Sequence, residues 1–242
     1  MKSIRQYPVD GRGLQSRLAQ MFNPESGRTV LLAIDHGYFQ GAPEGLKNLK
    51  KTIKPLLPYC DAISPCIGGL KYIDSWSKTP IILRATGGNS MTKPEELDDE
   101  IVTVSVEEML RNNAIGFTVS CYVGFPHQRQ TLENLTKLTN EAHKYGLVSI
   151  GITALGKSLG EEKNIGKNKE YLEHACRVIS ENGADIVKTY YCPGFESVVK
   201  SCLSPIVVAG GTKVETKEAL DFTYKSIQSG AVGIDMGRNI FQ

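Results

Sequence analysis

Short apolar runs rich in β-branched residues recur along the chain, and stretches with helical spacing of apolar residues lie between them. Most of these runs lack the alternation of polar and apolar residues that marks a half-exposed strand, so they predict parallel strands covered on both faces. Strands that alternate with helices predict an α/β protein with a parallel sheet. The eight runs are Val30–Asp35, Asp61–Cys66, Pro80–Ala85, Ala114–Val123, Leu147–Thr153, Asp185–Tyr190, Ser204–Gly211 and Ala231–Gly237.

Eight strand–helix units favour a closed (β/α)8 barrel over an open doubly wound sheet. Neither G-x-G-x-x-G nor G-x-x-x-x-G-K-[ST] occurs, which removes the main support for an open nucleotide-binding sheet. Because one such barrel needs about 250 residues, the 242 residues predict a single barrel domain over 1–242. The predicted outer helices are Gly45–Tyr59, Val106–Asn112, Gln130–Tyr145, Lys169–Asn182, Phe195–Cys202 and Lys217–Ser229.

Two further patterns agree with a barrel. Three of the longer helices end at Gly146, Gly183 and Gly230, just before the next strand, as expected of a left-handed helix cap followed by a short loop. Before the first strand, Leu14–Phe22 carries apolar residues on one helical face. We expect this helix to cover the bottom of the barrel.

Composition excludes several classes of protein. The 28 Lys and Arg against 26 Asp and Glu give no basic excess for binding nucleic acid. The N-terminus lacks the apolar segment of a signal peptide, and no run is long enough to span a membrane. The six cysteines form no C-x-x-C pair, which favours reduced thiols over disulfides or a zinc site. We therefore expect a soluble cytoplasmic protein with no membrane or nucleic-acid partner.

Polar residues at the carboxyl ends of the predicted strands are the candidates for chemistry, because barrel enzymes place their sites there. Histidines elsewhere in the chain lack the spacing to other ligands that a metal would need, so we expect no metal. The candidates at the strand ends include Asp35, His36, Arg84, Thr153, Lys188, Tyr190 and Asp235.

Lys188 lies in the middle of an apolar strand. Burial disfavours the charged form of an amine, and a neutral amine attacks a carbonyl to form a Schiff base. The alternative is a lysine whose stem packs in the core while its ammonium reaches water or pairs with Asp35 or Asp235. Asp35 is placed to hold or move a proton near an iminium. If the strand continues, His36 points to the side opposite to Asp35. We expect His36 to have a packing or capping role, or to lie in the pocket wall.

Two glycine turns predict an anion site. Gly210 and Gly211 follow the seventh strand, and Gly237 and Arg238 follow the eighth. These are the loops that often hold phosphate in such barrels, through backbone N–H groups and a guanidinium. The alternative is ordinary glycine in a tight turn.

The strand ends also resemble a known family. IDHGYFQG, LRATGGNS, IVKTYY, PIVVAGGTK and GIDMGRNIFQ are similar to segments of the archaeal-type class I aldolase family related to DeoC and FbaB. The resemblance implies a (β/α)8 barrel, Lys188 as the Schiff-base lysine and Asp35 as the active-site carboxylate. It also implies that Gly210, Gly211, Gly237 and Arg238 cradle a substrate phosphate.

One departure from the family pattern refines the expected reaction. The fructose-bisphosphate aldolases of the family have a Tyr acid/base at the end of strand five, where this chain has Ala154. The thiolase members, which act in autoinducer-2 breakdown, also lack that Tyr. The resemblance to them implies acetyl transfer from 3-hydroxy-5-phosphonooxypentane-2,4-dione to coenzyme A, with coenzyme A as co-substrate and no bound cofactor.

Two alternatives stay open. One is a Schiff-base aldolase or related aldol transferase that acts on a sugar phosphate. The other is a non-catalytic relative that binds a phosphorylated metabolite. In either case we expect a homo-oligomer.

The eighth predicted strand ends close to the end of the sequence. Only Arg238–Gln242 follow it, which is too few residues for an eighth outer helix. We expect a C-terminally short barrel, with the outer face of its last strand uncovered.

Overall fold

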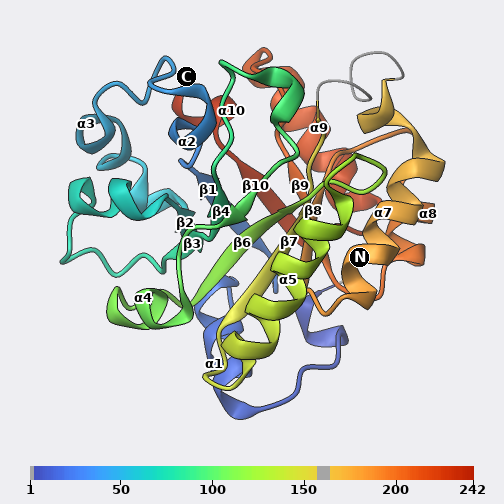
Figure 1. Ribbon diagram of the computed structural model, residues 1–242, viewed down its shortest axis with the longest axis horizontal. Helices are drawn as coiled ribbons and strands as arrows, with labels where there is room; N and C mark the ends of the chain where they lie inside the picture. The colour runs from blue at the N-terminus through green and yellow to red at the C-terminus, as the bar shows by residue number, and fades with distance from the viewer. Residues whose placement is uncertain (1–2, 157–163) are drawn as a thin grey trace.

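The computed structural model describes residues 3–156 and 164–242, and its centre is a ring of parallel strands (Figure 1). The strands lie in the order β2-β1-β10-β9-β8-β7-β6-β3. A parallel bridge between Ile63 and Ile81 joins β2 to β3 and closes the ring, so the predicted (β/α)8 barrel is confirmed. The strands are β1 (Thr29–Ala33), β2 (Ala62–Ser64), β3 (Ile82–Arg84), β6 (Gly116–Cys121), β7 (Val148–Thr153), β8 (Ile186–Thr189), β9 (Ile206–Ala209) and β10 (Gly233–Met236).

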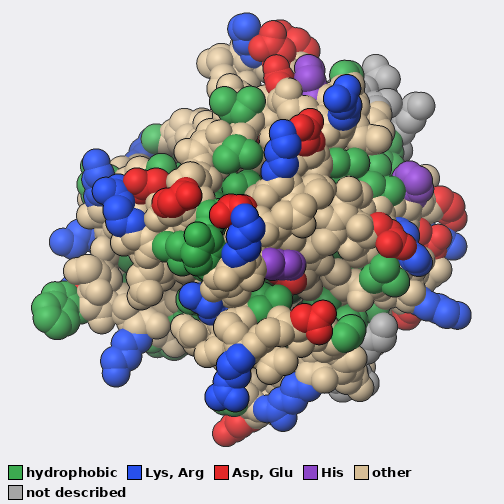
Figure 2. Space-filling model, turned by 60° about the horizontal axis from the view of Figure 1, so that its bottom comes forward, with side chains coloured by type: hydrophobic (Ala, Val, Ile, Leu, Met, Phe, Trp, Pro, Cys, Tyr) green, Lys and Arg blue, Asp and Glu red, His purple; other side chains and the backbone are tan. Residues whose placement is uncertain are grey.

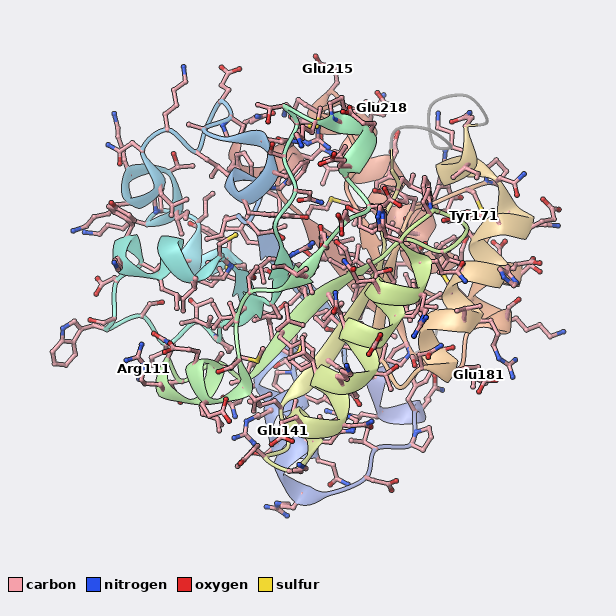
Figure 3. The ribbon with its side chains drawn as sticks, viewed as in Figure 1. Arg111, Glu141, Tyr171, Glu181, Glu215 and Glu218 are labelled. Carbon is pink, nitrogen blue, oxygen red and sulfur yellow. The ribbon has the colours of Figure 1, made fainter. Side chains whose placement is uncertain are left out.

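Helices surround this ring. In Figure 1, α3 lies to the left of the strands and α7 and α8 lie to the right. Tyr171 and Glu181, labelled in Figure 3, lie in the first turn and at the last residue of α7. The Tyr171 hydroxyl donates a 2.8 Å hydrogen bond to the Val123 carbonyl beyond β6. The helices are α2 (Gly37–Gln40), α3 (Leu49–Ile53), α4 (Val106–Arg111), α5 (Gln128–His143), α7 (Lys169–Glu181), α8 (Phe195–Ser201) and α9 (Thr216–Gln228).

The first predicted outer helix differs from the structure. The expected helix Gly45–Tyr59 is wrong in length: the structure has the short α3 and the 3-10 helix η2 (Leu57–Tyr59). Pro55 and Pro58 lack the backbone N–H groups that a continuous helix needs, which explains the break. The other 3-10 helices are η1 (Ile4–Gln6), η3 (Ile67–Tyr72), η4 (Pro94–Glu96) and η5 (Ile165–Lys167).

Helix α1 (Arg12–Met21) covers the bottom of the barrel, as predicted. Its Leu14, Leu18 and Met21 form one buried cluster with apolar residues from most of the strands, among them Leu31 and Val207. This packing closes the end of the barrel opposite to the candidate site. The predicted helix ends are confirmed as well, since Gly146, Gly183 and Gly230 all have positive φ.

A hairpin that the sequence did not indicate follows β3. Its strands β4 (Thr86–Gly87) and β5 (Ile101–Val102) pair antiparallel outside the barrel sheet. Each strand has only two residues, too few to give a recognisable period. The hairpin brings residues 86–102 to the mouth of the barrel.

The chain after β10 forms the four-residue helix α10 (Arg238–Phe241). Phe241 packs against Leu32, Ile34 and Leu46, on the outer side of β1. In β10, Ile234 and Met236 are only 9% and 2% exposed, so the expected uncovered apolar face is not seen there. Charged side chains of both signs are scattered over the surface shown in Figure 2. None of the helices in the described ranges is both long and apolar enough to cross a membrane.

Candidate active site

A cavity of about 280 Å³ opens at the carboxyl ends of the barrel strands. Because parallel strands all end on the same side of the barrel, residues far apart in the sequence meet there. Of the residues predicted for the site, Thr153 alone is not in the cavity wall. The others that line it are Asp35, His36, Arg84, Lys188, Tyr190, Gly210, Gly211, Asp235, Gly237 and Arg238.

Lys188 reaches into this cavity from β8 and forms an ion pair. Its Nζ lies 3.0 Å from Oδ1 of Asp235 on β10, and the two side chains are 12% and 1% exposed. Burial raises the pKa of Asp235, although the Lys188 cation opposes the shift. The carboxylate therefore both stabilises the ammonium and is a better proton acceptor than an exposed aspartate. The sequence left two interpretations open for Lys188, an active-site amine or a lysine paired with an aspartate. The structure agrees with both, because Lys188 faces the cavity and is paired with Asp235.

Asp35 lies across the cavity mouth at the end of β1. Its Oδ2 is 3.7 Å from Nη1 of Arg84, and its Oδ1 is 3.9 Å from Nδ1 of His36. Burial lowers the pKa of His36, against the pull of Asp35. The imidazole is therefore neutral at pH 7. His36 lies beside Asp35 in the cavity wall, so the prediction that it points away is wrong: β1 ends at Ala33, and the alternation of a strand does not reach these two residues. Its edge-on contact with Phe241, at 5.5 Å between ring centres, fits the predicted packing role.

Glu100 forms the largest polar network of the site, and the sequence analysis did not identify this residue. The side chain is fully buried, and its two oxygens accept hydrogen bonds of 2.7 and 2.8 Å from Nη2 of Arg84. It also accepts hydrogen bonds from the hydroxyls of Tyr38 (2.7 Å), Thr86 (2.6 Å) and Tyr122 (3.3 Å). The hairpin is thus attached to the barrel by a buried ion pair at the cavity wall.

Arg84, Tyr38 and Tyr122 all line the cavity. Arg84 also donates a 2.6 Å hydrogen bond to the Tyr38 hydroxyl, and its guanidinium carbon lies 4.4 Å from the centre of the Tyr38 ring. Burial raises the pKa of Tyr38 and of Tyr122. Both phenols therefore stay protonated at neutral pH and act as hydrogen-bond donors in the wall.

The two predicted glycine turns meet around Arg238. The Asn239 side chain joins them, donating to the carbonyls of Gly210 (2.8 Å) and Thr212 (3.1 Å). A Cβ at Gly237 would collide with His36 and Ala33, so only glycine fits there. Nε of Arg238 is buried and, within the described ranges, has no hydrogen-bond partner. A half-buried arginine with an unpaired Nε beside two glycine loops is suited to an oxyanion such as phosphate.

Thr153 corrects one prediction. It lies on the far face of β7, where its hydroxyl hydrogen-bonds to Thr189 at 2.8 Å. Its neighbours Ile152 and Ala154 face the cavity instead, because successive side chains of a strand point to opposite sides. The sequence therefore predicts the strand end correctly but assigns Thr153 to the wrong face.

No cysteine lines this cavity within the described ranges. Cys121 and Cys192 are fully buried elsewhere, and burial raises the pKa of both thiols. The same part of the chain contains no group of three or more His, Cys, Asp or Glu side chains that could hold a metal ion. The polar chemistry of the cavity therefore comes from its amine, carboxylates, guanidinium groups and phenols.

Comparisons with known proteins agree with this geometry. A family model described as DeoC/LacD family aldolase matches residues 29–242. The chain is 41% identical over 232 residues to an uncharacterized aldolase of Pasteurella multocida and to a 3-hydroxy-5-phosphonooxypentane-2,4-dione thiolase of Photorhabdus laumondii. Each alignment covers 95% of this chain and 77% of the relative. The fold is also that of a Schiff base-forming fructose-1,6-bisphosphate aldolase, with a TM-score of 0.80, 24% identity and coverage of 94% of this chain and 93% of the other.

Proposed function

Because the chain belongs to the DeoC/LacD family of aldolases, we propose that it cleaves a carbon–carbon bond of a phosphorylated diketone through a Schiff base on Lys188 and passes the acetyl group to coenzyme A. The observation that carries this proposal is the convergence of Lys188, Asp235 and the unpaired Arg238 Nε on one cavity. The thiolase relative in Photorhabdus laumondii supports 3-hydroxy-5-phosphonooxypentane-2,4-dione as the substrate.

The first half of the reaction uses the ion pair between Lys188 on β8 and Asp235 on β10. Lys188 gives a proton to Asp235, and its neutral amine attacks the C4 ketone next to the phosphorylated carbon. Loss of water then gives an iminium, whose positive charge the Asp235 carboxylate stabilises once its proton has left. Arg238 and the Gly210–Gly211 turn hold the phosphate, which sets C4 at the lysine.

The second half breaks the C2–C3 bond. The thiol of coenzyme A loses its proton and attacks the C2 carbonyl, and the bonding electrons of C2–C3 move into the iminium to give an enamine. Acetyl coenzyme A leaves, C3 of the enamine takes a proton, and water hydrolyses the resulting iminium. The products are acetyl coenzyme A and a three-carbon dihydroxyketone phosphate, and Lys188 is regenerated.

Tyr190 is our candidate for the proton transfers that Ala154 cannot perform. It lies two residues after Lys188 and faces the same cavity, because side chains two apart on a strand share a face. Burial raises the pKa of Tyr190, although the Lys188 and Arg238 cations oppose the shift. Tyr190 is therefore protonated at neutral pH and can act as a general acid.

We expect Tyr190→Phe to lower kcat by about 10²-fold, since a positioned acid or base contributes about that much. Schiff-base formation, measured by trapping with borohydride, should persist. Tyr191→Phe is the matched control, because Tyr191 packs between Phe195 and Phe222, at 5.4 and 5.5 Å between ring centres, away from the cavity. Equal kcat values for the two variants would contradict the role of Tyr190.

We expect Arg238→Met to raise KM for the phosphorylated substrate by about 10²-fold, because a charge-assisted contact to the phosphate is lost. Arg238→Lys should recover part of that loss, since lysine keeps the charge but not the planar fork. Arg111→Met removes an exposed arginine of α4, labelled in Figure 3 and paired with Glu108, and should leave KM unchanged. A normal KM in Arg238→Met would show that the phosphate binds elsewhere.

The proposed function is tested by a product assay on the purified chain with and without coenzyme A. We expect acetyl coenzyme A and the dihydroxyketone phosphate in equal amounts, and neither product without a thiol. Cleavage of a sugar phosphate without any thiol would instead show an aldolase.

Six free cysteines fit a reducing cytoplasm, which is the compartment we propose. The homo-oligomer stays a prediction that sedimentation measurements test.

A further inference from the structure

A second and larger cavity lies next to the candidate active site. It has a volume of about 650 Å³ and is bounded by the loop after β1, the start of α3, and η3. Asp35 and Tyr38 line both cavities. The second cavity therefore borders the active site on the side of β1 and β2, away from Lys188.

The expected orientation of the substrate in the active site determines the side from which the thiol of coenzyme A approaches. With the phosphate at Arg238 and C4 at Lys188, the acetyl end of a linear five-carbon substrate extends away from the β9 and β10 loops. Across the ring from the β9 and β10 loops, the active-site wall contains Arg84 of β3 and the Tyr38 side chain that Arg84 contacts. A thiol that attacks the acetyl carbon must therefore arrive near residues that the second cavity shares.

The surface outside the second cavity is rich in lysine. Five exposed lysines gather on α3 and η3 and beside them, and we call them the lysine face: Lys47, Lys50, Lys51, Lys54 and Lys71. Within the described ranges none of the five forms an ion pair, although Asp74 shares a hollow with three of them. Figure 2 shows Lys and Arg side chains along its left edge, the side on which Figure 1 places α3.

Exposed aromatic rings accompany the lysine face. Tyr59, Tyr72 and Trp76 are 81%, 58% and 91% exposed, and Tyr72 also lines the second cavity. A flat exposed ring beside cations is suited to stacking with a base of a phosphorylated nucleoside.

We propose that coenzyme A, the acceptor in the proposed function on which this inference rests, binds across the lysine face with its thiol arm in the second cavity. The lysine face then meets the phosphate groups of the nucleotide, and Tyr72 or Trp76 stacks on the adenine. Cys66 lines the second cavity, but burial raises the pKa of its thiol to about 12. It is therefore protonated at neutral pH and does not compete with coenzyme A for the acetyl group.

The test is charge reversal in Lys50→Glu/Lys54→Glu. We expect KM for coenzyme A to rise about ten-fold or more, because two attractions to the nucleotide phosphates become repulsions. Values of kcat, of KM for the phosphorylated diketone and of KM for pantetheine should stay unchanged, since pantetheine has the thiol arm but no nucleotide. Lys50→Ala/Lys54→Ala should shift KM for coenzyme A in the same direction by less.

Lys200→Glu/Lys225→Glu, on α8 and α9, is the control for net charge and should leave all these values unchanged. An unchanged KM for coenzyme A in Lys50→Glu/Lys54→Glu, or an equal rise in the control, overturns the location while the thiolase function stands. Absence of coenzyme A-dependent turnover in the unaltered protein overturns the proposed function itself. In that case calorimetric titration with coenzyme A decides the site: binding weakened by Lys50→Glu/Lys54→Glu supports it, and no binding overturns it.

Discussion

Lys188→Arg should lower the rate of carbon–carbon bond cleavage by on the order of 10⁴-fold or more, because a guanidinium stays charged and cannot form the Schiff base. Arginine keeps a cation beside Asp235, whose side chain is only 1% exposed. Lys188→Ala should abolish activity as well, but it leaves that carboxylate unpaired and is expected to destabilise the fold. The measurement is kcat/KM of each variant, together with its thermal unfolding.

Lys225→Ala, on the exposed surface of α9, is the control for lysine removal and should retain full activity. If Lys188→Arg keeps the rate of the unaltered protein, the lysine has a structural role and the mechanism proposed for β8 is wrong. Loss of activity together with a normal unfolding transition separates catalysis from folding.

Glu100→Gln should lower the free energy of unfolding by about 3 kcal/mol, because it leaves Arg84 buried without its closest counterion. Arg84 is 4% exposed, and Asp35 at 3.7 Å is the other carboxylate in contact with it. The glutamine keeps the shape of the side chain but not its charge, so the loss reports on the ion pair. Urea unfolding of the variant, followed by circular dichroism, measures it.

Glu95→Gln is the matched control for this variant, because Glu95 is exposed on η4 in the same hairpin, and it should change stability by less than about 0.5 kcal/mol. The double variant Arg84→Met/Glu100→Leu should be more stable than the sum of the single losses predicts, since both charges leave the interior together. Equal stability of Glu100→Gln and the unaltered protein would show that the hairpin is attached by its other contacts.

The barrel could be predicted from the sequence because parallel strands covered on both faces leave long apolar runs with little alternation. Residues such as Lys188 and Asp235 stand out against that background, and the glycines at strand ends mark the loops. The helix predicted over Gly45–Tyr59 failed where two prolines interrupt an otherwise helical pattern. The prediction that Thr153 lines the cavity was wrong because the last residues of a strand must be assigned to one of its two faces, and an error of one residue reverses the face.

Glu100 and the second cavity could not be predicted for a different reason. Glu100 lies at the end of the acidic stretch EELDDE, which is typical of a solvated loop, and only the two-residue strands of the hairpin turn it inward. The charges of the lysine face are balanced by acidic residues elsewhere in the chain, so the net charge does not reveal them. That these lysines gather on one side depends on the fold. Contacts between distant segments decide both features.

The most direct test of the account is to trap the covalent intermediate. The protein is incubated with 3-hydroxy-5-phosphonooxypentane-2,4-dione and sodium borohydride in the absence of coenzyme A, and its peptides are then analysed by mass spectrometry. We predict one stable adduct, on the peptide that contains Lys188, and no adduct in Lys188→Arg. An adduct on another lysine, or turnover without any adduct, would contradict a Schiff base at Lys188.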